Sequence, residues 1–155
     1  MRNYGRALLM IGTLVAFAGC GDDTHGLPAP PPPTGPDGGA PAATFTQVYT
    51  TVITNRCTPC HTTANGIGIQ QGHLDMTTQA AAYANLVNVP AAGIACGGRG
   101  IRVVPDMPDS SIMYLKISLD DPTPCGGKMP LGGPPLTKAQ DDLIKSWITG
   151  GALND

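Results

Sequence analysis

The sequence contains no glutamate and few large aromatic side chains. All eleven acidic residues are aspartate, and the part from Thr44 to Asp155 has one Phe, one Trp and three Tyr. A segment of about 110 residues with so much Gly and Pro has little apolar volume to offset the backbone entropy that is lost on folding. A bound apolar group would supply that volume, so the composition favours a cofactor.

Sequence features of several functional classes are also missing. The chain has nine basic residues. Without Arg2 and Arg6 near the N-terminus, seven basic residues stand against eleven aspartates, which gives a net charge of −4. These seven basic residues form no stripe. We therefore expect no nucleic-acid partner. The sequence has no second C-x-x-C and no H-x-x-x-H for a zinc site, and no paired carboxylates or Ser/His/Asp arrangement for a substrate site.

An export signal is predicted at the N-terminus. Arg2 and Arg6 precede an apolar run of eleven residues from Ala7 to Phe17, which is shorter than the roughly 20 residues needed to cross a bilayer. A short apolar run after basic residues is typical of a secretory signal peptide, so residues 1–19 are interpreted as one. The chain is therefore expected in the bacterial cell envelope, facing the periplasm or the cell surface.

Cys20 follows two small residues, Ala18 and Gly19, and this small-small-Cys ending resembles the lipobox of bacterial lipoproteins. The resemblance implies that Cys20 becomes the lipidated first residue and anchors the chain to a membrane. Phe17 departs from the aliphatic residue that usually begins a lipobox, and ordinary secretion with Cys20 as a spare thiol is the alternative. Residues 20–43, rich in Pro and Gly, are predicted to form a tether with almost nothing to bury.

The most specific pattern in the chain is Cys57-Thr58-Pro59-Cys60-His61. Two thiols three residues apart on one helical turn point the same way, so each can bond one vinyl-bearing edge of a single porphyrin. The imidazole of His61 can then ligate the iron from the proximal side. The motif therefore predicts one covalent haem c. A zinc site would need a second pair of ligands, a thioredoxin-like dithiol would need a βαβ context, and a disulfide across two residues is uncommon.

Hydrophobic spacing predicts an all-α domain over residues 44–155. Thr44 to Gln47 fits a capping box that begins a helix running into the haem motif, and Thr137 to Gln140 fits a second one. Two further helices are expected from Thr78 through Val87 and from Asp109 to Ser118. The last helix is predicted to carry Asp141 and Asp142 in its first turn and to end at Gly150-Gly151. Its buried side is predicted to be Leu143, Ile144, Trp147 and Ile148. The third helix, from Asp109 to Ser118, is predicted to have Ile112, Leu115 and Leu119 on one side.

Cys96 and Cys125 remain once the other three cysteines are assigned. In an exported chain these two are expected to form a disulfide, because unpaired thiols are uncommon in an oxidising compartment.

Met129 is the leading candidate for the second iron ligand. It lies in the irregular segment Gly126-Gly127-Lys128-Met129-Pro130, far enough along the chain to fold over the distal face. A thioether opposite histidine raises the reduction potential and fills the sixth coordination site, which suits electron transfer better than substrate binding. Other candidates are Met107, which lies in a similar loop, and Met76 and His73; Met113 is interpreted as core packing.

Together the haem motif, the late Lys128-Met129-Pro130 and the capped last helix with Trp147 resemble a class I cytochrome c. The segments from Val103 to Lys116 and from Met129 to Gly133 narrow the resemblance to bacterial cytochrome c-like lipoproteins of the myxobacterial or planctomycetal type. The resemblance implies short helices and long loops wrapped around one haem, with His61 and Met129 as axial ligands. The glycine-rich middle is longer than in that family, so contacts from Ile94 to Arg102 cannot be transferred.

Three functions compete at this point. The first is a membrane-tethered electron carrier, not an enzyme, that exchanges single electrons with redox partner proteins. The second is a haem-based sensor or peroxidase-like enzyme, which requires that Met129 leave the distal site open. The third is a haem-free structural lipoprotein with structural or redox cysteines.

Overall fold

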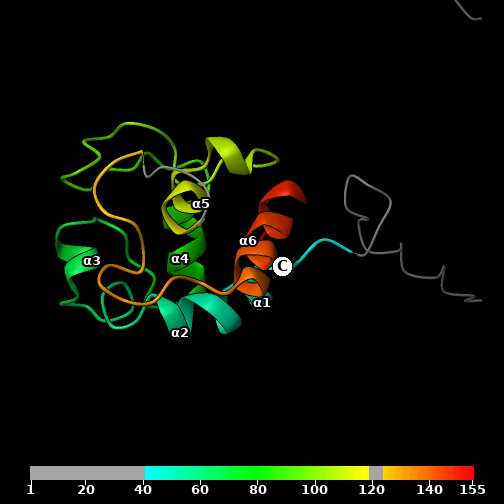
Figure 1. Cartoon of the computed structure of the whole chain (residues 1–155), viewed down its shortest axis with the longest axis horizontal. Helices are drawn as coiled ribbons and strands as arrows, with labels where there is room; N and C mark the ends of the chain where they lie inside the picture. The colour runs from blue at the N-terminus through cyan, green and yellow to red at the C-terminus, as the bar shows by residue number, and fades with distance from the viewer. Residues whose placement is uncertain (1–40, 119–123) are drawn as a thin grey trace, which may run out of the picture. The chain divides into compact units, whose positions relative to one another are not determined.

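The computed structural model describes residues 41–118 and 124–155, and in these residues the regular structure is helical, with isolated bridges and no strand (Figure 1). The described part of the chain is therefore all-α, as the sequence predicts. Residues 1–40 and 119–123 lie outside it, and with them the predicted signal peptide, Cys20 and most of the tether. None of the described helices has the length and apolarity that a membrane span requires.

The first helical segment has three parts: α1 (Phe45–Val48), the π-helical η1 (Tyr49–Ile53) and α2 (Thr54–Arg56). The predicted capping box is present, since the Thr44 hydroxyl accepts from the amide of Gln47 and the Gln47 side chain accepts from the amide of Thr44. The far end of the chain adds a third acceptor, because the Asp155 carboxylate accepts from the amide of Phe45 at 2.8 Å. The two ends of the domain thereby stabilise each other.

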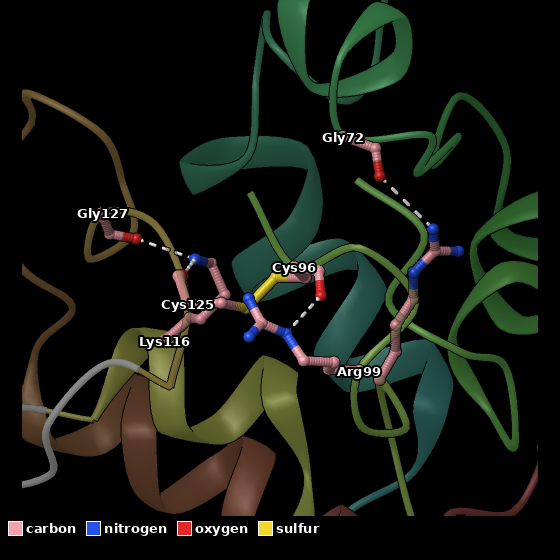
Figure 2. Close-up of a disulfide and its surroundings, with 7 residues drawn as sticks. Gly72, Cys96, Arg99, Lys116, Cys125 and Gly127 are labelled. Carbon is pink, nitrogen blue, oxygen red and sulfur yellow. Dashed lines mark hydrogen bonds between the residues drawn. A yellow bond between two sulfur atoms is a disulfide. The ribbon is translucent and has the colours of Figure 1, made fainter. Parts of the chain in front are cut away.

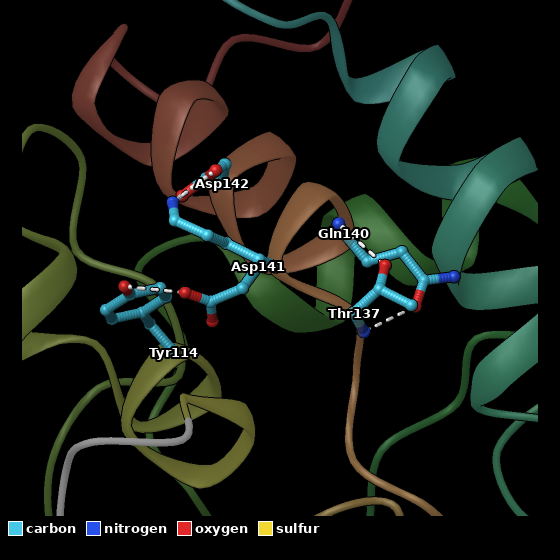
Figure 3. Close-up of polar contacts among 6 residues, drawn as sticks. Tyr114, Thr137, Gln140, Asp141 and Asp142 are labelled. Carbon is cyan, nitrogen blue, oxygen red and sulfur yellow. Dashed lines mark hydrogen bonds and ion pairs between the residues drawn. The ribbon is translucent and has the colours of Figure 1, made fainter.

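The last helix, α6 (Lys138–Thr149), begins with the second capping box, formed by Thr137 and Gln140 (Figure 3). It buries Ile144, Trp147 and Ile148, while Leu143 lies half-buried at the edge of the core. Gly150 ends the helix and Gly151 takes a φ of +92°, which suits a residue without Cβ. Asp141 lies in the first turn, but Asp142 does not; it forms an exposed ion pair with Lys138 instead.

The helix α4 (Gln79–Leu86) is capped by Thr78, whose hydroxyl accepts from the amide of Ala81. The expected helix from Asp109 to Ser118 is in fact two pieces, the 3₁₀ turn η2 (Pro108–Ser110) and α5 (Ile112–Ile117). They are separated by Ser111, an extended residue whose buried hydroxyl bonds the backbone of Val104 and Met107. The buried face of α5 is Ile112, Tyr114 and Ile117 rather than the predicted set with Leu115, and Leu119 lies outside the described residues.

The core lies between the first helical segment, α4 and α6. Phe45 is fully buried, and its ring centroid lies 4.9 Å from that of Trp147 and 5.3 Å from that of Tyr83. Aromatic pairs at these distances stabilise beyond their buried area. This cluster contains most of the few aromatic side chains of the domain. Little apolar surface is therefore left to bury residues 57–75, which follow α2, and residues 124–135, which precede α6.

Asp141 also faces Tyr114, whose hydroxyl donates to its Oδ2 atom at 3.1 Å (Figure 3). The other oxygen, Oδ1, is buried without a hydrogen-bond partner. Burial raises the pKa of Asp141 above its ordinary value, and the hydrogen bond from Tyr114 only partly opposes this. A carboxyl group whose pKa is raised by folding binds its proton more tightly in the folded state. The free energy of unfolding therefore falls as the pH rises from the ordinary pKa of Asp141 to its raised pKa in the folded state.

Replacing Asp141 by asparagine should remove this pH-dependent loss of stability, because the amide keeps an acceptor for Tyr114 and carries no charge. Urea unfolding of both proteins from acid to neutral pH should show the variant gaining on the parent as the pH rises. Asp142→Asn is the control: it removes the exposed ion pair with Lys138 and a charge that raises the pKa of Asp141 less than burial does, and it should change the free energy of unfolding by less than about 0.5 kcal/mol at each pH. Parallel curves for the parent and Asp141→Asn would contradict the assignment.

Cys96 and Cys125 form a disulfide, as the sequence predicts, with a sequence separation of 29 and a Cα–Cα distance of 5.1 Å. Cys96 is buried in a small second cluster with Ala91 and Ile112. Figure 2 shows the bridge joining the glycine-rich middle of the chain to the segment that leads to Met129. It therefore fixes one end of the segment that was predicted to supply the second iron ligand.

Removing the bridge by Cys96→Ser with Cys125→Ser should lower the free energy of unfolding by roughly 3–4 kcal/mol, the loop-closure value for a loop of this length. Guanidinium unfolding of the parent and of the double variant measures the loss. A reduced midpoint with a somewhat larger m-value is expected, since the unfolded chain without the bridge is less compact and exposes more surface. A loss below about 1 kcal/mol would mean that the unfolded chain is already restrained.

Candidate functional site

The motif Cys57 to His61 follows α2 directly, as predicted. The amide of Cys57 donates to the carbonyl of Ile53 at 3.1 Å, and the amide of His61 donates to the carbonyl of Cys57 at 2.9 Å. One hydrogen-bonded turn therefore spans both cysteines and the histidine. Because α2 continues from α1 and η1, which bury Phe45, Val48, Val52 and Ile53 in the core, the motif begins at a fixed point of the fold.

Both cysteines of the motif are half-buried and neither is in a disulfide. Cys57 packs against the main core, and burial raises the pKa of its thiol to about 12, although the positive charge of Arg56 opposes the rise. At neutral pH the Cys57 side chain is therefore a protonated thiol. Redox-active dithiols attack as thiolates with lowered pKa values, so this environment does not suit that alternative.

The imidazole of His61 is oriented by a backbone carbonyl. Its Nδ1 atom lies 3.1 Å from the carbonyl oxygen of Leu74. A carbonyl only accepts, so Nδ1 carries the proton and Nε2 keeps its lone pair free to bind a metal. Burial lowers the pKa of His61, and the charges of Arg102 and Lys116 add to this against the opposing hydrogen bond to Leu74. The ring is therefore kept in its neutral, ligating form.

Two glycines allow the segment after the motif to close around it. A Cβ on Gly68 would lie 2.4 Å from ring atoms of His61, and a Cβ on Gly66 would lie 2.2 Å from the carbonyl oxygen of Cys60. Gly68 belongs to α3 (Ile67–Gln70), a single turn that is not among the helices predicted from the sequence. It therefore packs directly on the imidazole, and neither glycine can take a side chain without moving the motif.

Met129 is held next to α5 rather than on a free loop. Its amide donates to the carbonyl of Lys116 at 2.8 Å, and its side chain is half-buried against the main core. The ammonium of Lys116 donates to the carbonyls of Cys125 at 2.5 Å and Gly127 at 2.9 Å (Figure 2), and that of Lys128 donates to the carbonyl of Leu115. A pocket of about 210 Å³ opens beside Met129 and is lined by Ile117, Ser118, Lys128, Met129, Pro130, Gly133 and Pro135.

Two residues link this segment to the motif. Lys116 bonds the backbone of Met129 and is also near enough to His61 to lower the pKa of its imidazole. Arg56, the residue before Cys57, donates to the carbonyls of Pro134 at 2.6 Å and Pro135 at 3.1 Å, while its Nε atom is buried without a partner. The segment that carries Met129 is therefore held by α5 and by α2, the element that leads directly into the motif.

The other candidate ligands lie in different settings. Met107 is 52% exposed. Met76 is buried in the core, and its amide donates to the carbonyl of His61, which places it beside the motif's own backbone. Met113 is half-buried against the core, in agreement with its interpretation as packing, and His73 is exposed. The described residues contain no group of three or more His, Cys, Asp or Glu that could hold a metal ion.

The residues that hold the predicted ligands in place were not predicted from the sequence. Leu74 acts through its carbonyl and Gly68 through its lack of a Cβ, and neither role has a sequence signature. Arg102 and Lys116 are ordinary basic residues in the sequence and acquire their roles only through burial.

Comparison with protein-family models, with curated proteins and with solved structures finds no match to this chain.

Proposed function

We propose that this chain is a monohaem c-type cytochrome of class I, tethered to a membrane of the bacterial envelope by a lipid on Cys20, and that it carries single electrons between redox partner proteins. The observation that carries the proposal is His61: within a Cys-x-x-Cys-His motif, its ring is neutral, its Nδ1 proton is held by Leu74 and its Nε2 is free. This is the state in which a proximal ligand binds iron.

The residues fit the group that the motif implies. Cys57 and Cys60 are the two attachment thiols, His61 is the proximal ligand and Met129 is the distal one. Between Cys57 and Asp75 only Gly68 is buried, and none of residues 124–135 is. A porphyrin between these two segments would bury apolar surface that the aromatic core does not cover.

The haem supplies an iron that cycles between Fe(III) and Fe(II). The chain's own residues hold it and set its preference for the electron. The carbonyl of Leu74 fixes the orientation of His61 and raises its basicity, and the segment around Met129 is fixed to α5 by Lys116. A thioether at the sixth position would exclude added ligands and raise the reduction potential, so the arrangement favours electron transfer over sensing or peroxidase chemistry.

A pyridine haemochrome spectrum of protein matured in a host that attaches haem c tests the proposal. We expect the spectrum of a porphyrin whose two vinyl groups are saturated, and haem that stays with the protein in acid–acetone. Haem that extracts into the organic phase, or none at all, would leave the haem-free lipoprotein as the better reading. Bound haem that takes up CO or imidazole readily would favour the sensor or peroxidase-like alternative.

A further inference from the structure

Arg102 is a buried cation whose hydrogen bonds go to backbone carbonyls. Arg102 is only 5% exposed to solvent. Its Nη1 atom donates to the carbonyl of Asn85 at 2.8 Å, and its Nη2 atom donates to the carbonyls of His73 at 2.6 Å and Gly72 at 3.3 Å. Within residues 41–118 and 124–155, no carboxylate forms an ion pair with it. Buried arginines are usually paired with an anion, so this one needs an explanation.

The position of Arg102 points to the proximal histidine. Two of its three acceptors, Gly72 and His73, come directly before Leu74, whose carbonyl holds Nδ1 of His61. His73 has a φ of +48°, an unfavourable value for a residue with a Cβ, and its carbonyl makes the shortest of the three bonds to Arg102. The guanidinium is thus fixed one residue away from the hydrogen bond that orients the predicted iron ligand.

The charge of Arg102 has a consequence for the iron. An arginine stays protonated under all physiological conditions, so its positive charge is permanent. Reduction of Fe(III) to Fe(II) removes one positive charge from the iron, and a fixed cation nearby favours that step. For charges roughly 10 Å apart in a protein interior, the effect on the equilibrium is more than about tenfold. Because Arg102 is buried, salt screens this effect little.

We propose that Arg102 is a residue that sets the reduction potential, a permanent buried charge on the His61 side of the haem that favours the reduced iron. The inference rests on the proposed function and goes beyond it, because it assigns the control of the potential to a residue that does not ligate the iron. It also gives the buried arginine of the glycine-rich middle a role, because its repulsion with the iron falls when the electron arrives.

Redox titration of the full haem-loaded chain tests this with three variants. Arg102→Gln removes the charge and keeps a donor, and should lower the equilibrium constant for reduction about tenfold, a shift of about 59 mV for one electron. Asn85→Asp keeps Arg102 and puts a negative charge on the residue whose backbone carbonyl accepts from its Nη1 atom, with loss of the side-chain bond from Asn85 to the carbonyl of Ala81. It should shift the potential in the same direction. This variant also tests the idea if Arg102→Gln does not fold. Arg102→Lys keeps the charge and loses the fork, and should stay within about threefold of the parent.

The outcomes separate charge from positioning. Loss of the carbonyl bonds alone would loosen Leu74 and reduce the basicity of His61, which raises the potential instead of lowering it. Three results would each overturn the inference in a protein that still holds its haem. They are equal shifts in Arg102→Gln and Arg102→Lys, a raised potential in Arg102→Gln, and no shift in Asn85→Asp. A parent protein without covalent haem would overturn the proposed function itself.

Discussion

Replacing Cys57 and Cys60 together by serine should abolish covalent haem attachment and leave the segments 57–75 and 124–135 open to proteases. These segments contribute almost no buried side chains to the core, and the few large side chains of the domain are gathered around Phe45 and Trp147. Without the porphyrin, little apolar burial remains to offset the entropy of ordering them. We expect a chain that has lost native helicity, first in α3, which lies in the first of these segments, and in α5, whose Lys116 carbonyl accepts from Met129 in the second.

Limited proteolysis with mass spectrometry, together with circular dichroism, measures this effect. The matched control is Cys96→Ser with Cys125→Ser, which also removes two cysteines but should keep the haem bound and the helicity near that of the parent. Native helicity and protease resistance in the Cys57/Cys60 variant would contradict the expectation that folding depends on haem. They would show that the aromatic core between α1, α4 and α6 is sufficient on its own.

Replacing Met129 by alanine should abolish the weak red absorption band that arises from a thioether bound to Fe(III). The same change should lower the reduction potential by on the order of 0.1–0.3 V, within the range of about 0.8 V over which axial ligands set haem potentials. The reason is that a thioether stabilises Fe(II) more than Fe(III), whereas the water or hydroxide that replaces it does not. The iron should also become open to added imidazole and, when reduced, to CO.

Met107→Ala is the matched control, because Met107 lies in a similar loop but is 52% exposed. It should leave the band and the potential unchanged. If Met129→Ala keeps the band and Met107→Ala loses it, the assignment of the distal ligand is wrong.

The disulfide can be tested on the same band: since Lys116 and Lys128 also hold this segment, Cys96→Ser with Cys125→Ser should weaken the band without removing it.

The helices that could be predicted from the sequence are those with local signals. Thr44 with Gln47 and Thr137 with Gln140 are capping boxes in the structure, and each begins a helix that is buried along one side. The elements that were missed depend on distant contacts. The turn α3 contains a glycine and is held by the carbonyl of Cys60, and the break at Ser111 depends on hydrogen bonds to residues on the preceding loop.

The same division applies to the site. Side chains with distinctive chemistry, such as Cys57, Cys60 and His61, stand out by their spacing, and the pairing of Cys96 with Cys125 was predicted by elimination, on the expectation that the chain is exported. The acceptor for His61 could not be predicted, because any residue at position 74 presents a carbonyl. Arg102 could not be predicted either, because its burial results from how the glycine-rich middle folds against α4.

The most direct test of the account is the mass of the tryptic peptide that begins at Cys57. Trypsin cleaves after Arg56 and next after Arg99, so one peptide carries Cys57, Cys60 and His61, and Cys96 is released from its partner by reduction. From protein matured in a host that attaches haem c, we predict a peptide that is heavier by the mass of one haem and that keeps this mass after reduction and denaturation. A peptide with the unmodified mass would contradict the account.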